Sequence, residues 1–241
     1  MTWEQVGTIR FRRRELRFED TIMMRYFRFQ IKCGYAPIML ICGRQRTGKT
    51  FAAMTIAEYI SAFRGQKFSF SDMFFKIEDM AQRYDEESKK VFILDEAGID
   101  LNVYEGNQLH QRVFQKIIES QAVKQNILLI VLPHARDIGA HHFHHVNCIL
   151  EMTGRGKGIL KYVWMRYGEL SKKPPYIEPF EYLRDIPLPS TELSEKYLAV
   201  GQSEYKQKIL SEQIGLLTQR RLIKEGKRKP KEKVAMSIPG F

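Results

Sequence analysis

The hydrophobic positions of the chain fall into short continuous runs, separated by longer segments in which they recur at helical spacing. Apolar runs at 37–42, 91–95 and 127–132 predict three buried strands. The spacing at 48–63 and 106–123 predicts two helices between them. Strands that alternate with helices predict an α/β fold, with a mostly parallel sheet and helices on both faces.

Weaker signals add four further elements. The stretch "KFSF" at 67–70 predicts a short strand, and the charged segment at 71–88 predicts a helix. Residues 146–152 and 159–167 predict two more strands, which the glycine-rich turn "TGRGKG" joins. With 241 residues, the chain is long enough to bury one sizeable core.

Composition divides the chain into four predicted parts. They are a basic lead-in at 1–35, a core at 36–167, a proline-rich connection with a charged helical segment at 168–224, and a basic, disordered tail at 225–241. The proline-rich stretch predicts an extended, ordered connection that follows the core.

One octapeptide carries specific chemistry. "GRQRTGKT" fits the pattern GxxxxGK(S/T), which forms a phosphate-binding loop when a strand precedes it and a helix follows it, as predicted here. We expect Lys49 to reach the β- and γ-phosphates of a nucleotide, and the Thr50 hydroxyl to hold Mg²⁺. The alternative is a glycine-rich turn without a ligand. The predicted nucleotide-binding residues are Gly43, Arg44, Gln45, Arg46, Thr47, Gly48, Lys49 and Thr50.

A phosphate-binding loop needs an acidic partner site, and "VFILDEAG" supplies one. Asp95 ends an apolar strand, where its carboxylate can reach the shell of the metal ion. Glu96 follows directly, which suits a general base that polarises the attacking water. The alternative for Glu96 is a charge at the start of a helix near Gly98. Together the two motifs predict a hydrolase that uses ATP and Mg²⁺.

Three segments together resemble the core of the HerA/FtsK-type ATPases: "GRQRTGKT", "VFILDEAG" and "NILLIVLPH". The resemblance covers roughly residues 36–167 and is greatest to the small Zot-like and archaeal virus or plasmid ATPases. It implies a RecA-like fold, ATP and Mg²⁺ as ligands, and a homo-oligomeric ring, often hexameric in that family. It also implies ATP-driven movement of DNA for virion packaging, export or conjugative transfer, with a capsid, a membrane complex or a relaxase as partner.

The resemblance further implies a polar γ-phosphate sensor at the tip of the 127–132 strand. His134 takes this place where the family usually has glutamine, so the sensor role and that of a loop histidine without catalytic function both stay open. Ring ATPases also use an arginine from a neighbouring subunit to offset charge in the transition state. The candidates are Arg112, Arg136 and Arg155, with Lys124 as a cationic alternative.

The charge of the chain favours an anionic partner. The formal net charge is +11, which suits nucleic acid or an acidic membrane surface. Basic residues concentrate at 10–32 and 220–233, where they contact DNA phosphates or, alternatively, form solvated ends. Aromatic residues among the N-terminal arginines are able to stack on bases or to pack onto the core. They are Phe11, Phe18, Tyr26, Phe27 and Phe29.

The histidines and cysteines do not favour a metal site. The cluster "AHHFHHV" has no accompanying carboxylate or thiol pattern, which favours a polar surface or a subunit contact. Its members are His141, His142, His144 and His145. The three cysteines lack paired spacing, so we expect neither a disulfide framework nor a zinc knuckle. They are Cys33, Cys42 and Cys148.

Two other functions fit part of the pattern. A small-molecule kinase uses the same loop, but Glu96 beside Asp95 argues against it. An ATP-switched DNA-binding protein, such as an AAA+ initiator or helicase loader, would bind DNA with little turnover. The N-terminus lacks the apolar core of a signal peptide, and no apolar run approaches the roughly 20 residues of a membrane span. We therefore expect a cytoplasmic protein (host cytoplasm if viral) or one held peripherally at a membrane or capsid portal.

Overall fold

A computed structural model describes residues 17–95, 108–138, 140–164 and 176–200 of the chain. The chain divides into two compact units, Met1–Leu193 and Ser194–Phe241. The elements that build the candidate site all belong to the first unit. The division into four parts predicted from composition stays a prediction.

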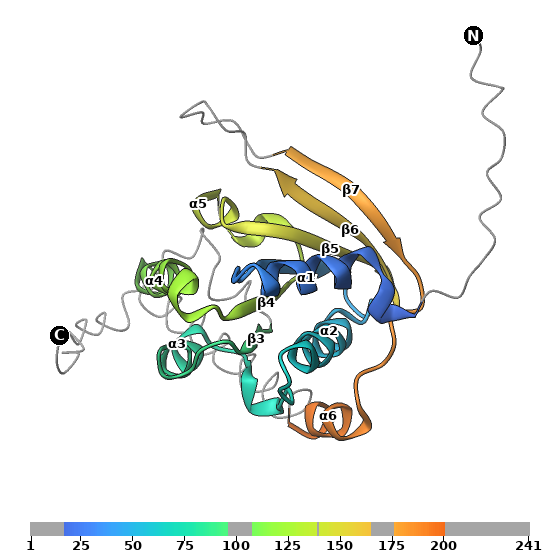
Figure 1. The fold of residues 1–241 in the computed structure, drawn as a ribbon, viewed down its shortest axis with the longest axis horizontal. Coiled ribbons are helices and arrows are strands. Elements are labelled where there is room, and N and C mark those ends of the chain that lie inside the picture. The colour runs from blue at the N-terminus through green and yellow to red at the C-terminus, as the bar shows by residue number, and fades with distance from the viewer. Residues whose placement is uncertain (1–16, 96–107, 139, 165–175, 201–241) are drawn as a thin grey trace, which may run out of the picture. The chain divides into compact units, whose positions relative to one another are not determined.

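The first unit contains a seven-stranded, mostly parallel mixed sheet with the order β2-β3-β4-β1-β5-β6-β7 (Figure 1). The strands are β1 (Ile38–Gly43), β2 (Met73–Phe74), β3 (Val91–Leu94), β4 (Ile127–Leu132), β5 (Val146–Gly154), β6 (Lys157–Trp164) and β7 (Tyr176–Leu183). The strands β1 to β5 are parallel, whereas β6 and β7 each run antiparallel to their neighbour. The strand that leads into the predicted phosphate loop, β1, is therefore central.

Helices pack on both faces of this sheet. They are α1 (Ile22–Lys32), α2 (Lys49–Phe63), α3 (Ile77–Glu86), α4 (Gln108–Lys124) and the short α5 (Ala140–Phe143). Successive side chains of a strand point to opposite faces. Ile38, Leu40 and Cys42 of β1 share one buried cluster with α3 and α4, while α2 packs on β1, β3 and β4 and also contacts α1. The predicted α/β architecture with a mostly parallel sheet is confirmed.

The segment between α2 and β3 differs from the prediction. Residues 67–70 do not form a strand, and the helix predicted at 71–88 begins only at Ile77. Ser69 and Asp72 cause the difference, because the Ser69 hydroxyl accepts from the Ser71 backbone while the Asp72 carboxylate accepts from the Ser69 backbone. This local turn consumes the polar groups that a helix would use, and the chain then enters β2 beside β3.

The proline-rich stretch also differs from the prediction, because it is not a connection along its whole length. Residues 176–183 form β7, and seven of its eight residues pair with β6. A proline cannot donate to a strand ladder, so it is confined to edges and bulges. Pro179 meets both conditions, since β7 is the last strand of the sheet and the pairing shifts register beside its partner Lys161.

Most of the described aromatic residues of the basic lead-in pack onto the protein. Phe27 is fully buried, Tyr26 contacts the rings of Phe27 and Tyr162, and Phe18 contacts Tyr59. Phe29 remains 61% exposed. Phe11, like residues 1–16 as a whole, lies outside the described residues.

None of the helices within the described ranges has the length and apolarity that a membrane crossing requires.

The start of α1 is tied to the last strand of the sheet. The Glu181 carboxylate of β7 accepts hydrogen bonds from the backbone nitrogens of Ile22 and Met23, at 2.9 and 2.8 Å. The Thr21 hydroxyl accepts from Met24 as the N-cap. A carboxylate at this position satisfies two helix donors and interacts favourably with the helix dipole.

Glu181→Ala is therefore expected to lower the free energy of unfolding by about 1–2 kcal/mol, because two backbone donors lose a charged acceptor. Urea denaturation monitored by circular dichroism measures this. The exposed Glu178 of the same strand provides the control, since Glu178→Ala removes the same charge without touching α1. Equal loss of stability in both variants would contradict the capping role.

Candidate functional site

The predicted phosphate loop joins the end of β1 to the start of α2. Gly48 is the N-cap of α2 with φ 84°, and Arg46 has φ 63°. At Gly43, with φ 145°, an added Cβ would lie 2.5 Å from the carbonyl oxygen of Met152 on β5. Only glycine fits there, because both the backbone conformation and the space exclude a side chain.

Hydrogen bonds within the loop hold its two ends together. The Lys49 ammonium donates to the carbonyl oxygens of Gly43 and Arg44, at 2.8 and 3.0 Å. The Thr47 hydroxyl donates to the same Arg44 carbonyl at 2.8 Å. The loop thus surrounds the Lys49 ammonium at the N-terminus of the fifteen-residue helix α2. The first backbone N–H groups of a helix also point toward this end.

The second predicted motif meets the first at the start of α2. The Thr50 hydroxyl lies 3.2 Å from each carboxylate oxygen of Asp95, although 45 residues separate them in the chain. Asp95 is 1% exposed, and its backbone nitrogen donates to Phe74 on β2. A hydroxyl and a carboxylate are the oxygen ligands that Mg²⁺ prefers, so this pair fits the predicted metal site. Glu96 lies outside the described residues.

The tip of β4 lies beside the loop. β4 is placed between β1 and β3, and the Gly43 backbone nitrogen donates to the carbonyl of Pro133 at 3.2 Å. Residues His134 to Asp137 form a tight turn in which the Asp137 carboxylate accepts from the His134 nitrogen at 2.9 Å. β1 and β4 are parallel, so the loop and this turn follow the same end of the sheet. His134, the candidate sensor, is exposed in the turn.

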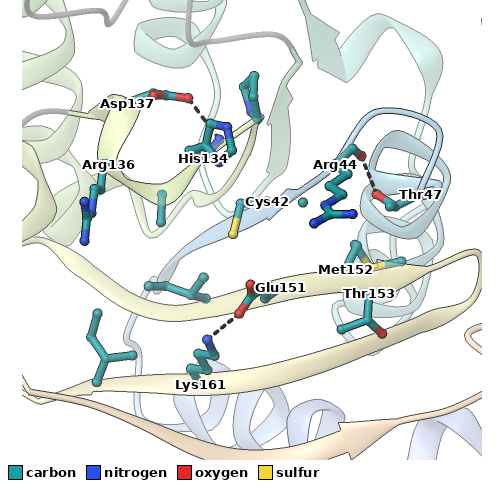
Figure 2. Close-up of a pocket in the computed structure, with 15 residues that line it drawn as sticks. Cys42, Arg44, Thr47, His134, Arg136, Asp137, Glu151, Met152, Thr153 and Lys161 are labelled. Atoms are coloured by element: carbon teal, nitrogen blue, oxygen red, sulfur yellow. Dashed lines mark hydrogen bonds and ion pairs between the residues drawn. The ribbon is translucent and has the colours of Figure 1, made fainter.

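A cavity of about 930 Å³ adjoins the loop. Arg44 and Thr47 line it from the loop, and His134 and Arg136 line it from the β4 tip (Figure 2). Across from them, Glu151 of β5 and Lys161 of β6 point toward each other and form an ion pair. These two residues were not predicted from the sequence. The available signal was a charged residue among the apolar positions of each strand, at 151 and 161, which favours a pair across the two strands.

Cys42 also reaches this cavity, at the end of β1. Burial, together with the neighbouring Glu151 carboxylate, raises the pKa of its thiol to about 11. The thiolate is the nucleophilic form of cysteine, so Cys42 is protonated and unreactive near neutral pH. It serves here as a small residue in the cavity wall.

The four cationic candidates occupy different places. Arg136 lines the cavity, and the backbone of Arg155 approaches Gly48. Arg112 is exposed on α4. Lys124, at the end of α4, contacts Asp85 through both the backbone carbonyl and the carboxylate. It precedes β4, and so lies at the opposite end of that strand from His134.

The histidine cluster spans α5 and the turn that precedes β5. His142 is 7% exposed and meets the ring of Phe114 edge-on at 4.9 Å between centroids, which differs from the predicted polar surface. Burial, followed by the neighbouring His144, lowers the pKa of His145. Within the part of the chain that the structure describes, no group of three or more metal-ligating side chains comes together.

No protein-family model matches the chain, and no curated protein is similar to it in sequence. Solved structures with a related arrangement include the Escherichia coli MS115-1 HORMA:CdnC:Trip13 complex, with a TM-score of 0.37, 14% identity and 49% of each chain covered. Another is the cytoplasmic domain of the Thermomonospora curvata type VII secretion ATPase EccC, with a TM-score of 0.36 and 9% identity. That match covers 61% of this chain and 24% of EccC.

Gly43→Ala is expected to destabilise the protein by about 2 kcal/mol or more, because the new Cβ meets the Met152 carbonyl and the backbone conformation is strained. Thermal unfolding in the absence of nucleotide measures the effect. Gly154→Ala, at the end of β5, is the matched control, since a Cβ there has nothing within 4 Å. A Gly43→Ala protein as stable as wild type would show that β5 does not press on this position.

Proposed function

We propose that the chain is an ATPase of the RecA-like type that uses Mg²⁺ and couples ATP hydrolysis to the movement of DNA. The observation that carries this proposal is the contact between Thr50 of the GxxxxGKT loop and Asp95 at the end of β3. Two motifs that each predict one half of a nucleotide–metal site meet in space through side chains of the required chemistry.

The strand order supports the RecA-like assignment. One strand, β4, lies between the strand of the loop and the strand that precedes Asp95, as the HerA/FtsK resemblance implies. Its tip carries His134 beside the loop, which supports a γ-phosphate sensor at this residue. The nucleotide contacts are assigned to the Gly43–Thr50 loop, with Lys49 as the cation that accompanies the phosphates.

The proposed metal ligands are Thr50 and Asp95. Bound there, Mg²⁺ would neutralise charge on the phosphate oxygens. Glu96 is the proposed general base, because it directly follows the residue that the structure places next to Thr50. Its carboxylate accepts a proton from water as the water oxygen attacks the γ-phosphorus, and the bond from that phosphorus to the β–γ bridging oxygen breaks.

DNA is the proposed partner on grounds of charge. The net charge of +11 and the basic stretches at 10–32 and 220–233 favour contacts to phosphates, without sequence preference. A homo-oligomeric ring, and a capsid, membrane complex or relaxase as a further partner, belong to the same proposal. An ATP-switched DNA-binding protein with little turnover is the outcome that would replace it.

Two substitutions test the catalytic assignment. Lys49→Ala is expected to abolish ATP hydrolysis and weaken nucleotide binding, because the loop loses its cation. Glu96→Gln is expected to retain ATP but to hydrolyse it at least roughly 100-fold more slowly, because the base is gone. Steady-state phosphate release and equilibrium ATP binding measure the two effects. The exposed residues Lys32 and Glu178 supply matched controls as Lys32→Ala and Glu178→Gln. Normal turnover in Glu96→Gln would remove Glu96 from the role of base.

Coupling to DNA requires a separate measurement. Double-stranded DNA is expected to stimulate ATP hydrolysis, and raising the salt concentration from 50 to 200 mM is expected to weaken the stimulation, because phosphate contacts release counterions. The assay compares hydrolysis with and without DNA at about these two concentrations. DNA binding with negligible hydrolysis in every condition would refute the motor and favour the ATP-switched protein.

A further inference from the structure

The hairpin formed by β5 and β6 lies against the loop at two points. The first is the contact between Gly43 and Met152, described above. At the second, an added Cβ on Gly48 would lie 3.9 Å from the Cα of Arg155. The end of β5 therefore runs alongside the loop from its first glycine to the glycine that caps α2.

The turn of this hairpin is held in place from two sides. Gly154 pairs with Lys157, which leaves only Arg155 and Gly156 to connect the strands. Gly156 has φ 67°, and its carbonyl accepts from the backbone nitrogen of Ile186 at 2.9 Å. The strand ladder and this hydrogen bond fix the backbone of Arg155 next to the start of α2.

This position places a permanent cation at the part of the loop that binds the α- and β-phosphates. In GxxxxGK(S/T) loops, the backbone N–H groups cradle these two phosphates, while the lysine reaches the β- and γ-phosphates. Arg155 is exposed, and its Cα lies beside Gly48, the N-cap of α2. An arginine guanidinium presents a planar fork of donors that matches phosphate oxygens.

We propose that Arg155 contacts the α- and β-phosphates of the nucleotide bound by its own chain. The inference rests on the proposed function, because it assumes that the loop binds a nucleotide. This role differs from that of an arginine finger, which a neighbouring subunit donates and which acts on the γ-phosphate during hydrolysis. Arg155 is then a binding residue for ADP as well as for ATP.

ADP affinity is the quantity that tests this inference, because a residue acting only on the γ-phosphate leaves it unchanged. Arg155→Ala in the full chain is expected to raise the Kd for ADP and for ATP by roughly tenfold, the loss of about one charge-assisted hydrogen bond. Isothermal titration calorimetry with Mg²⁺ present measures both constants. Arg155→Lys, which keeps the charge without the fork, is expected to fall between Arg155→Ala and wild type.

The matched control is Arg25→Ala, which removes an exposed arginine from α1 and is expected to bind ADP as wild type does. Thermal unfolding without nucleotide checks that Arg155→Ala is folded, and Arg155→Lys carries the test if it is not. An unchanged ADP affinity in Arg155→Ala and Arg155→Lys would overturn the inference and leave the ATPase proposal standing. Wild-type protein that binds no nucleotide would instead refute the ATPase proposal itself.

A mixing experiment distinguishes whether Arg155 acts at the site of its own chain or at that of a neighbouring subunit. Combining equal amounts of Arg155→Ala and Lys49→Ala protein is expected to give no more ATP hydrolysis than the average of the two separate variants, because every site lacks one residue of its own chain. Recovery of hydrolysis on mixing would mean that Arg155 serves a neighbouring site, and would overturn the assignment to its own chain.

Discussion

The candidate site depends on the close approach of two backbones, at Gly43 and Met152. Because Gly43 has no side chain, β5 can run against the end of β1, while β4 is tied to the same residue through Pro133. Three parallel strands thus end within hydrogen-bonding or van der Waals distance of one residue. The loop begins at this fixed point, and the Lys49 ammonium returns to the Gly43 carbonyl. Any side chain at Gly43 would separate β5 from the loop and so disturb every contact built on it.

The path of α2 explains why the two motifs meet, although their strands are not neighbours. β4 separates β1 from β3, so a helix that stayed over β1 could not bring Thr50 to Asp95. α2 packs on all three strands instead, and its first turn reaches the end of β3. Its buried residues include small ones such as Ala52, Ala53 and Ala57, which allow the helix to lie close to the sheet. The proposed metal site therefore depends on the path of α2 across β4, although β4 itself contributes no ligand.

The sequence predicts the parts of this fold where local and global signals agree. The runs at 37–42, 91–95 and 127–132 are apolar up to the strand ends, apart from Asp95, because these strands are covered on both faces, and all three form strands. β2 and β7 were not predicted, because two residues are too few for a pattern and the proline within β7, Pro179, argues locally against a strand. Pairing with β6 overrides that argument. The same limit applies to the site: the loop and Asp95 follow from motifs, whereas the Glu151–Lys161 pair and the approach of Arg155 to Gly48 arise from tertiary structure.

The order of strands in space also determines when the site can form during synthesis. β1 is complete at residue 43, but its two neighbours, β4 and β5, end at residues 132 and 154. A chain emerging from the ribosome therefore carries the loop without its flanking strands for about a hundred residues, while the apolar β1 needs protection from other chains. The N-terminus of α1 is capped even later, because Glu181 belongs to β7, the last strand. The site is thus assembled late in translation, from a segment made early.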